Sequence, residues 1–161
     1  MELLISQRET VNVKWSDICE VYNVPKKLKD HQADAISLIS AREHTFCGLP
    51  TGSGKTLAEV ATVLFTKGTA LVIPPLLTIE KQMCDVCDDW QISYLNLSTL
   101  SPQDILSAIE SISPQIIIAS IEKISDLNVQ KALLNVHLDY VAIDEAQVGL
   151  INIKKCPKIT P

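Results

Sequence analysis

Residues 49–56, Leu-Pro-Thr-Gly-Ser-Gly-Lys-Thr, form the part of this sequence whose residue types and spacing most clearly indicate chemistry. The run follows an apolar segment and opens an amphipathic helical pattern, the context that a phosphate-binding loop requires. Its two glycines let the backbone turn, so that successive N–H groups and the helix N-terminus point at phosphate oxygens. The lysine would meet the terminal phosphates and the last threonine would ligate Mg²⁺. The predicted nucleotide contacts are Pro50, Thr51, Gly52, Ser53, Gly54, Lys55 and Thr56.

A second signal is a pair of adjacent carboxylates, Asp144 and Glu145, which follow the apolar residues 140–143. An apolar strand would deliver both side chains at its carboxyl end, where α/β sheets bind their ligands. In an NTPase of this type we expect Asp144 to hold Mg²⁺ and Glu145 to orient and activate water. The pair lies 89 residues after Lys55, a spacing that fits the second nucleotide motif better than a solvated turn.

A third signal is Gln32, which precedes the loop on a helical segment, residues 29–40. A glutamine amide donates and accepts at once and so can recognise adenine. The histidines carry no comparable signal, because none has a cysteine or serine partner at a recognisable spacing. His31 and His44 flank this helix, and we expect both to be solvated.

The elements that position these residues alternate in type along the chain. Helical periodicity is clear at residues 57–65, 76–90 and 105–112, and weaker at 124–134, and Ser101-Pro102 is expected to begin the third helix. Two further helices, residues 16–22 and 29–40, come first. Short apolar strands between such helices predict βαβ units and a buried parallel sheet. The expected strands are residues 45–49, 69–74, 94–97, 115–120 and 139–143.

Composition limits the classes of protein that fit. The chain has 161 residues, and a hydrophobic content of 47% excludes a disordered chain. Its net charge of -5 argues against a free-standing basic nucleic-acid binder. Apolar runs are only strand-length and no signal peptide is visible, so we expect no membrane span and an intracellular protein, nuclear in a eukaryote. Cys84 and Cys87 form a CxxC beside Met83 and Trp90, which favours packing in the core over zinc.

Together these motifs resemble those of the superfamily 2 helicases, and most closely the RecQ family, over residues 14–147. The residues 71–82, a strand with a Pro-Leu turn, resemble the family motif that contacts the nucleic-acid backbone. Residues 117–124 resemble the strand that ends in a Thr-Pro-Glu-Lys segment. The resemblance implies a RecA-like P-loop NTPase domain with a mostly parallel, doubly wound α/β sheet. It also implies ATP and Mg²⁺ as cofactors, DNA as partner, and ATP-dependent 3′–5′ unwinding.

The sequence departs from the family pattern at several positions. Gln147 stands where the family has a histidine that couples hydrolysis to DNA binding, Pro25 replaces a stacking aromatic, and Lys29 replaces an arginine. After residue 147 the expected aromatic-rich loop and Ser/Thr motif are missing, as is a second RecA-like domain with its arginine finger. We therefore expect a helical lead-in over 1–28, an ATP-binding domain over 29–147 that is incomplete on its C-terminal side, and a divergent tail over 148–161.

We expect such a chain to bind DNA weakly and to be inactive in unwinding by itself. Two alternatives stay open from the sequence. One is a non-catalytic fragment that binds nucleotide or a partner. The other is a piece of an RNA or DEAD-type helicase, which shares the loop. A transporter ATPase is disfavoured, because its LSGGQ-type signature is missing and the nearest stretch, residues 97–101, does not supply it.

Overall fold

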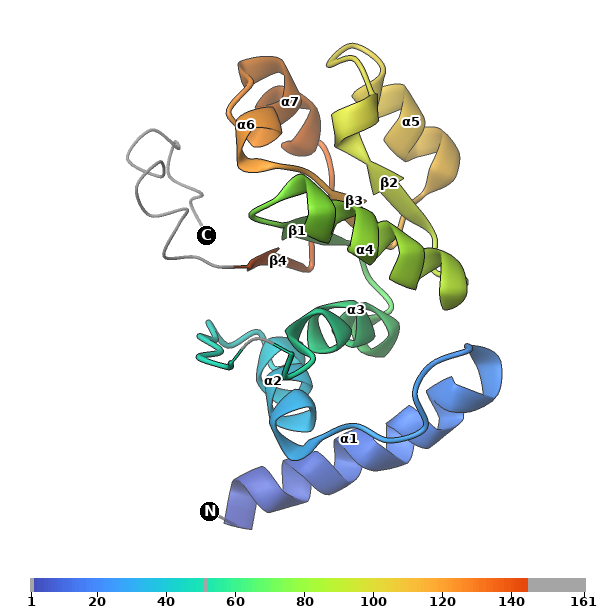
Figure 1. Cartoon of the computed structure of the whole chain (residues 1–161), viewed down its shortest axis with the longest axis vertical. Helices are drawn as coiled ribbons and strands as arrows, with labels where there is room; N and C mark the ends of the chain where they lie inside the picture. The colour runs from blue at the N-terminus through green and yellow to red at the C-terminus, as the bar shows by residue number, and fades with distance from the viewer. Residues whose placement is uncertain (1, 51, 145–161) are drawn as a thin grey trace. The chain divides into compact units, whose positions relative to one another are not determined.

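The computed structural model describes residues 2–50 and 52–144, which form two compact units. Of these residues, the first unit comprises 2–50, 52–68 and 86–92, and the second comprises 69–85 and 93–144. Figure 1 labels the α-helices and the strands, but not the short 3-10 helix. The elements follow in chain order. They are α1 Glu2–Val21, α2 Asp30–Ser40, α3 Lys55–Thr66, β1 Ala70–Ile73, α4 Leu77–Asp89, β2 Tyr94–Asn96, the short 3-10 helix η1 Leu97–Thr99, α5 Ile105–Ile112, β3 Ile116–Ile118, α6 Ile121–Ile124, α7 Leu127–Leu133 and β4 Tyr140–Ile143.

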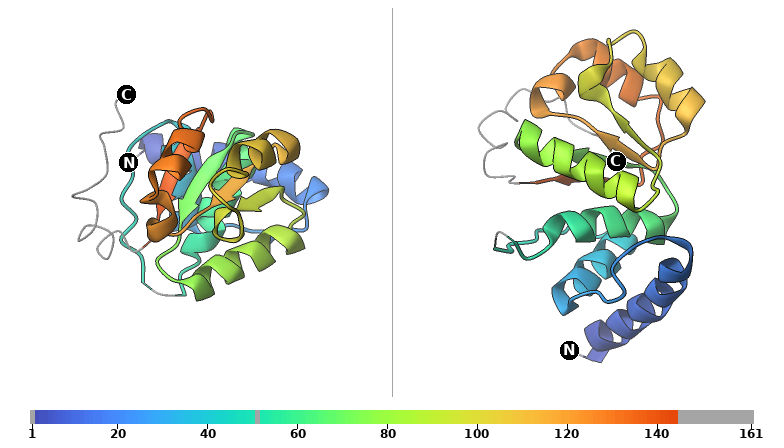
Figure 2. Two further views of the ribbon diagram at one scale, coloured as in Figure 1. Left: turned by 90° about the horizontal axis from the view of Figure 1, so that it is seen from above. Right: turned by 45° about the vertical axis from the view of Figure 1, so that its right-hand side comes forward.

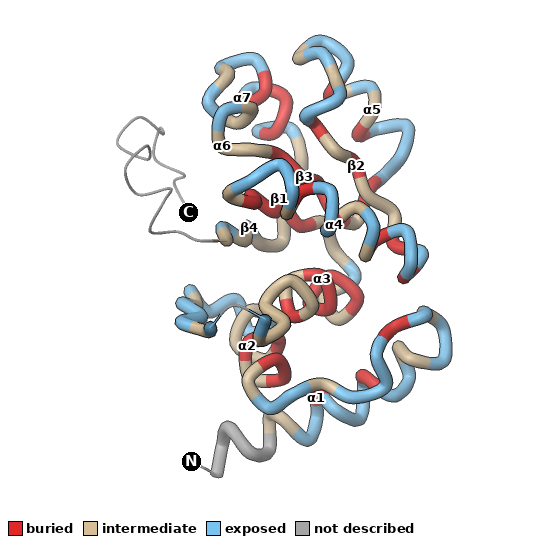
Figure 3. The backbone as a smooth tube through the Cα atoms, in the orientation of Figure 1, coloured by how far each residue is buried: buried red, intermediate tan, exposed pale blue. Residues whose placement is uncertain are grey.

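The second unit is built on a four-stranded sheet in which every neighbouring pair is parallel, in the order β2-β3-β1-β4. The two central strands, Ala-Leu-Val-Ile and Ile-Ile-Ile, are buried along their whole length, as Figure 3 shows. Strands that are buried on both faces read as continuous apolar runs, which is what these sequences are. The predicted α/β fold with a parallel sheet is therefore confirmed.

Helices lie on both faces of this sheet, which is the doubly wound arrangement (Figure 2). Leu95 of β2 belongs to a core that also contains Ile109 of α5 and Val129 of α7. Its neighbour Asn96 instead donates from Nδ2 to Glu80 of α4, at 2.8 Å. Because successive side chains of a strand point to opposite faces, α4 and α5 must cover opposite faces of the sheet.

The first unit is helical, and α2 packs against both α1 and α3. Trp15 of α1 is 2% exposed, and its Nε1 donates to the carbonyl of Pro25 at 2.8 Å, which holds the turn after α1 against that helix. Arg8 of α1 donates to the carboxylates of Asp30 and Asp34 on α2. These contacts place the first turn of α2, where Gln32 lies.

Three local predictions are wrong. Residues 45–49 form no strand: Leu49 N–H donates to Cys47 O within a turn, and Phe46 is 84% exposed. A short apolar run becomes a strand only beside a partner that takes up its backbone hydrogen bonds, and this run has local bonds instead. α1 begins far earlier than residue 16, at Glu2. α5 begins at Ile105, because residues 101–104 form a turn closed by the bond from Ser101 Oγ to Asp104 Oδ2 at 2.6 Å.

Other local predictions are confirmed or refined. Met83, Cys87 and Trp90 are buried, as core packing predicts, whereas Cys84 is only half-buried. The predicted helix at 124–134 is two short helices, α6 and α7, with Asp126 capping the second through Asn128 N–H. Within residues 2–50 and 52–144, no helix has the length and hydropathy of a transmembrane span. The domain boundaries expected from the sequence stay a prediction.

Candidate functional site

The phosphate-loop sequence adopts a conformation that its glycines make possible. Gly52 and Gly54 have φ of 78° and 90°, in the left-handed region that other residues rarely adopt. Gly54 is also the residue before α3, so the positive φ redirects the chain into the helix. A Cβ on Gly54 would lie well under 3.0 Å from Gln32 Nε2, so glycine is needed there for space as well.

The first turn of α2 holds this loop through three side chains. Gln32 is 3% exposed, and its amide is used at both ends: Oε1 accepts from Lys29 N–H at 2.8 Å and Nε2 donates to Gly54 O at 3.0 Å. His31 Nε2 lies 3.0 Å and Lys29 Nζ 3.3 Å from the carbonyl oxygen of Ser53. A carbonyl oxygen only accepts, so His31 Nε2 must carry a hydrogen. The expectation that His31 is solvated is wrong, since it is half-buried against the loop.

The N-terminus of α3 has the features of an anion site. It has no side-chain cap and no acidic residue in its first turn, so its leading N–H groups keep their attraction for negative charge. Ser53 Oγ is buried and has no hydrogen-bond partner among the described residues. A buried hydroxyl without a partner is costly unless a ligand supplies one. The loop, the helix end and this hydroxyl therefore fit a bound phosphate group.

The remaining loop residues keep the segment compact. Pro50 O accepts from Ser53 N–H at 3.2 Å, and Lys55 Nζ donates to Leu49 O at 3.3 Å, which folds the lysine back over the loop. Thr56 follows in the first turn of α3 and is half-buried. The predicted contact Thr51 lies outside the described residues.

In the second unit, Asp144 follows β4 directly and its N–H donates to Ile73 O of β1 at 3.2 Å. The parallel pairing places Asp144 at the carboxyl edge of the sheet, where ligands of such sheets bind. Glu145, the predicted water-orienting residue, and Gln147 lie outside the described residues. Of the two predicted Mg²⁺ ligands, Thr56 and Asp144, the second has its backbone fixed by pairing with the sheet.

Two further predicted motifs share this carboxyl edge, because they follow β1 and β3. After β1, Leu76 and Leu77 are 61% and 72% exposed at the start of α4. After β3, Ser120 caps α6 by accepting from Lys123 N–H at 3.2 Å, and Lys123 Nζ donates to Leu100 O. In the sheet order β3-β1-β4, the segments after β1 and β3 therefore lie together on one side of the strand that precedes Asp144.

The structure also shows roles that the sequence reading missed. His31 and Lys29 both contact Ser53 O, and Glu80 is 5% exposed while it accepts from Asn96 Nδ2 and from Ser98 Oγ at 3.0 Å. Lys29 lies three residues before Gln32, about one helical turn away, and this spacing could have indicated that its side chain also reaches the loop. For Glu80 the sequence offers no signal, because its partners are the last residue of β2 and a residue of η1, which lie 16 and 18 positions further along the chain.

Comparison with known proteins agrees with these motifs. A family model described as DEAD/DEAH box helicase matches residues 29–152, more than three quarters of the chain. The curated protein "ATP-dependent DNA helicase RecQ" of Bacillus subtilis (strain 168) is 32% identical over 127 residues. That alignment covers 75% of this chain and 21% of the relative, so the chain spans about a fifth of the relative's length.

Proposed function

Since the chain belongs to the DEAD/DEAH box helicase family, we propose that it is the ATP-binding part of an ATP-dependent DNA helicase of RecQ type. The observation that carries the proposal is the phosphate loop itself. Two glycines with positive φ lead into an uncapped helix beside a buried hydroxyl without a partner. The similarity to an ATP-dependent DNA helicase supports DNA as the nucleic acid, and the direction of movement that we propose is 3′ to 5′.

In this proposal each site residue has one task. Lys55 would leave Leu49 O and bind the terminal phosphates of ATP, Thr56 and Asp144 would hold Mg²⁺, and Glu145 would orient water. Bound Mg²⁺ would neutralise phosphate charge during transfer. The protein's own contribution is to point the N–H groups of the loop and of the start of α3 at the phosphates before the nucleotide arrives.

Gln32 can recognise adenine without giving up its present bonds. An amide oxygen has two lone pairs and an amide nitrogen two hydrogens, and the structure uses one of each. The second lone pair and the second hydrogen match the donor and acceptor on the adenine edge. Because Gln32 also braces Gly54, its loss should weaken phosphate binding in addition to base preference.

The proposal is tested by titrating the chain with a fluorescent ATP analogue in the presence of Mg²⁺. Replacing Lys55→Ala removes a charge-assisted bond, so affinity should fall about tenfold or more. Alanine is a good helix former, so α3 should survive, which circular dichroism can check. Lys27→Ala is the matched control, since Lys27 is an exposed lysine of the same unit. Equal affinity for the parent and the Lys55→Ala chain would refute the nucleotide site.

A second experiment addresses unwinding. Strand displacement would be measured with 3′-tailed and 5′-tailed duplexes at low salt, with ATP and Mg²⁺. Translocation in such motors uses two domains that close on the nucleotide, and an arginine finger adds roughly 10³-fold or more to the rate. We propose that the 161-residue chain binds ATP but displaces no strand by itself. ATP-dependent displacement by this chain would refute that part of the proposal.

A further inference from the structure

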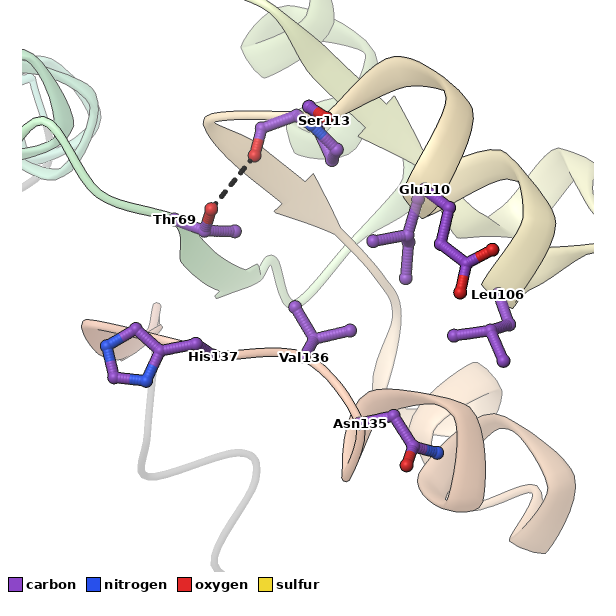
Figure 4. A pocket seen from close by; sticks show the side chains of 9 residues that line it. Thr69, Leu106, Glu110, Ser113, Asn135, Val136 and His137 are labelled. Atoms are coloured by element: carbon purple, nitrogen blue, oxygen red, sulfur yellow. Dashed lines mark hydrogen bonds between the residues drawn. The ribbon is translucent and has the colours of Figure 1, made fainter.

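We propose that a pocket of about 460 Å³ in the second unit binds an aliphatic cation, a primary amine or guanidinium group on a hydrocarbon stem. Figure 4 shows its walls. The nine lining residues come from α5 and from the segments that precede β1, β3 and β4. The volume lies within the range of small-molecule sites and exceeds that of a single side chain.

The pocket lies away from the predicted nucleotide residues of this unit. Thr69 directly precedes β1, Pro114 lies two residues before β3, and Thr69 Oγ1 donates to Pro114 O at 3.1 Å. Parallel strands all begin at one edge of their sheet and end at the other. The pocket is therefore at the amino edge, whereas Asp144 is at the carboxyl edge.

The apolar part of the wall can hold the hydrocarbon stem. Leu106 and Ile109 of α5 and Val136 after α7 line it, and Ile109 is 9% exposed. Leu106 and Glu110 are four residues apart on α5, so they share one face of the helix, and Figure 4 shows their side chains next to each other. A ligand whose methylene groups contact Leu106 would thus have its cationic group next to Glu110.

The polar part of the wall selects positive charge. Glu110 is the only Asp, Glu, Lys or Arg among the lining residues. It lies in the last turn of α5, which has no basic residue, so the carbonyl end of the helix adds negative potential. Asn135 uses its Nδ2 to donate to Lys131 O at 2.9 Å, which leaves Oδ1 as an acceptor. An alkylammonium or alkylguanidinium ion can donate to the exposed oxygens of both groups.

The cation could be a free amine or guanidine, or the basic side chain of a bound peptide. Amide NMR spectra of the whole chain test both sources of the cation. Butylguanidinium is the probe for a free small molecule, and a blocked Gly-Arg-Gly peptide is the probe for a basic side chain. The neutral probes of the same shape are butylurea and the citrulline peptide. We expect the charged probes to shift the signals of Leu106, Glu110 and Val136. Tighter binding of butylguanidinium would identify a small ligand, and tighter binding of the arginine peptide a peptide ligand.

The matched variants are Glu110→Gln and Glu122→Gln, both replacements of exposed carboxylates in this unit. Losing an exposed charge partner should weaken binding of the charged probes to Glu110→Gln about fivefold, and Glu122→Gln should bind like the parent. The proposal is overturned if no pocket signal shifts at saturating probe, if the neutral probes bind as well as the charged ones, or if Glu110→Gln keeps the parent's affinity.

Discussion

Replacing Gly54 with alanine separates the two reasons for a glycine in the phosphate loop. The first is backbone strain: an alanine at φ of 90° costs about 1–2 kcal/mol of folding free energy. The second is space, because the new Cβ would displace Gln32 Nε2 from Gly54 O. Leaving that buried amide without its partner costs a further 1–3 kcal/mol or so. We expect Gly54→Ala to lower the stability of the first unit by roughly 2–5 kcal/mol.

Gly52 provides the matched control. Its φ of 78° carries the same backbone strain, but a Cβ there would meet no atom within 4 Å. Gly52→Ala should therefore cost only about 1–2 kcal/mol. In a Gln32→Ala background the obstruction is gone, so Gly54→Ala should then cost no more than Gly52→Ala does.

Urea denaturation followed by tryptophan fluorescence measures these differences. Both tryptophans, Trp15 and Trp90, belong to the first unit and are 2% and 8% exposed, so their emission reports its unfolding. The free energies follow from the midpoints and slopes of the transitions. The reasoning is refuted if Gly52→Ala and Gly54→Ala lower the free energy of unfolding equally. It is also refuted if Gln32→Ala does not change the effect of Gly54→Ala, because Gln32 would then not support the loop.

Three further predictions concern specificity, the core and a thiol. In competition titrations the parent should prefer ATP to GTP, and Gln32→Ala should lose that preference; a parent that binds both equally would contradict the assignment to adenine. Ile117→Ala removes a side chain that is 0% exposed at the centre of the sheet, so urea denaturation followed by circular dichroism should show a loss of about 2–5 kcal/mol. Burial and then the charge of Glu59 raise the pKa of Cys47. Less thiolate is therefore present at a given pH, so iodoacetamide should label Cys47 more slowly than free cysteine, and faster after Glu59→Gln, while buried Cys87 stays unlabelled in the folded chain.

Periodic patterns predicted most helices and strands correctly, because the spacing of apolar residues marks the buried face of each element and differs between a helix and a strand. The helix from 57 to 65 is α3, and the apolar triplet Ile116–Ile118 is a central strand. Residues 45–49 show where this reasoning fails. Their composition suits a strand, but a strand also needs a neighbour for its N–H and C=O groups, and composition does not identify a neighbour.

The residues proposed to bind phosphate were predicted from the sequence alone. Glycine at 52 and 54 permits the positive φ that both residues adopt, and the order of the chain puts the lysine and the threonine at the start of α3. Only the tertiary structure decided what holds the loop. Gln32 and His31 lie 22 residues before their partners Gly54 and Ser53, and they reach them because α2 packs on α3. That packing depends on side chains spread over three helices, so no local pattern around either residue could have predicted the contacts.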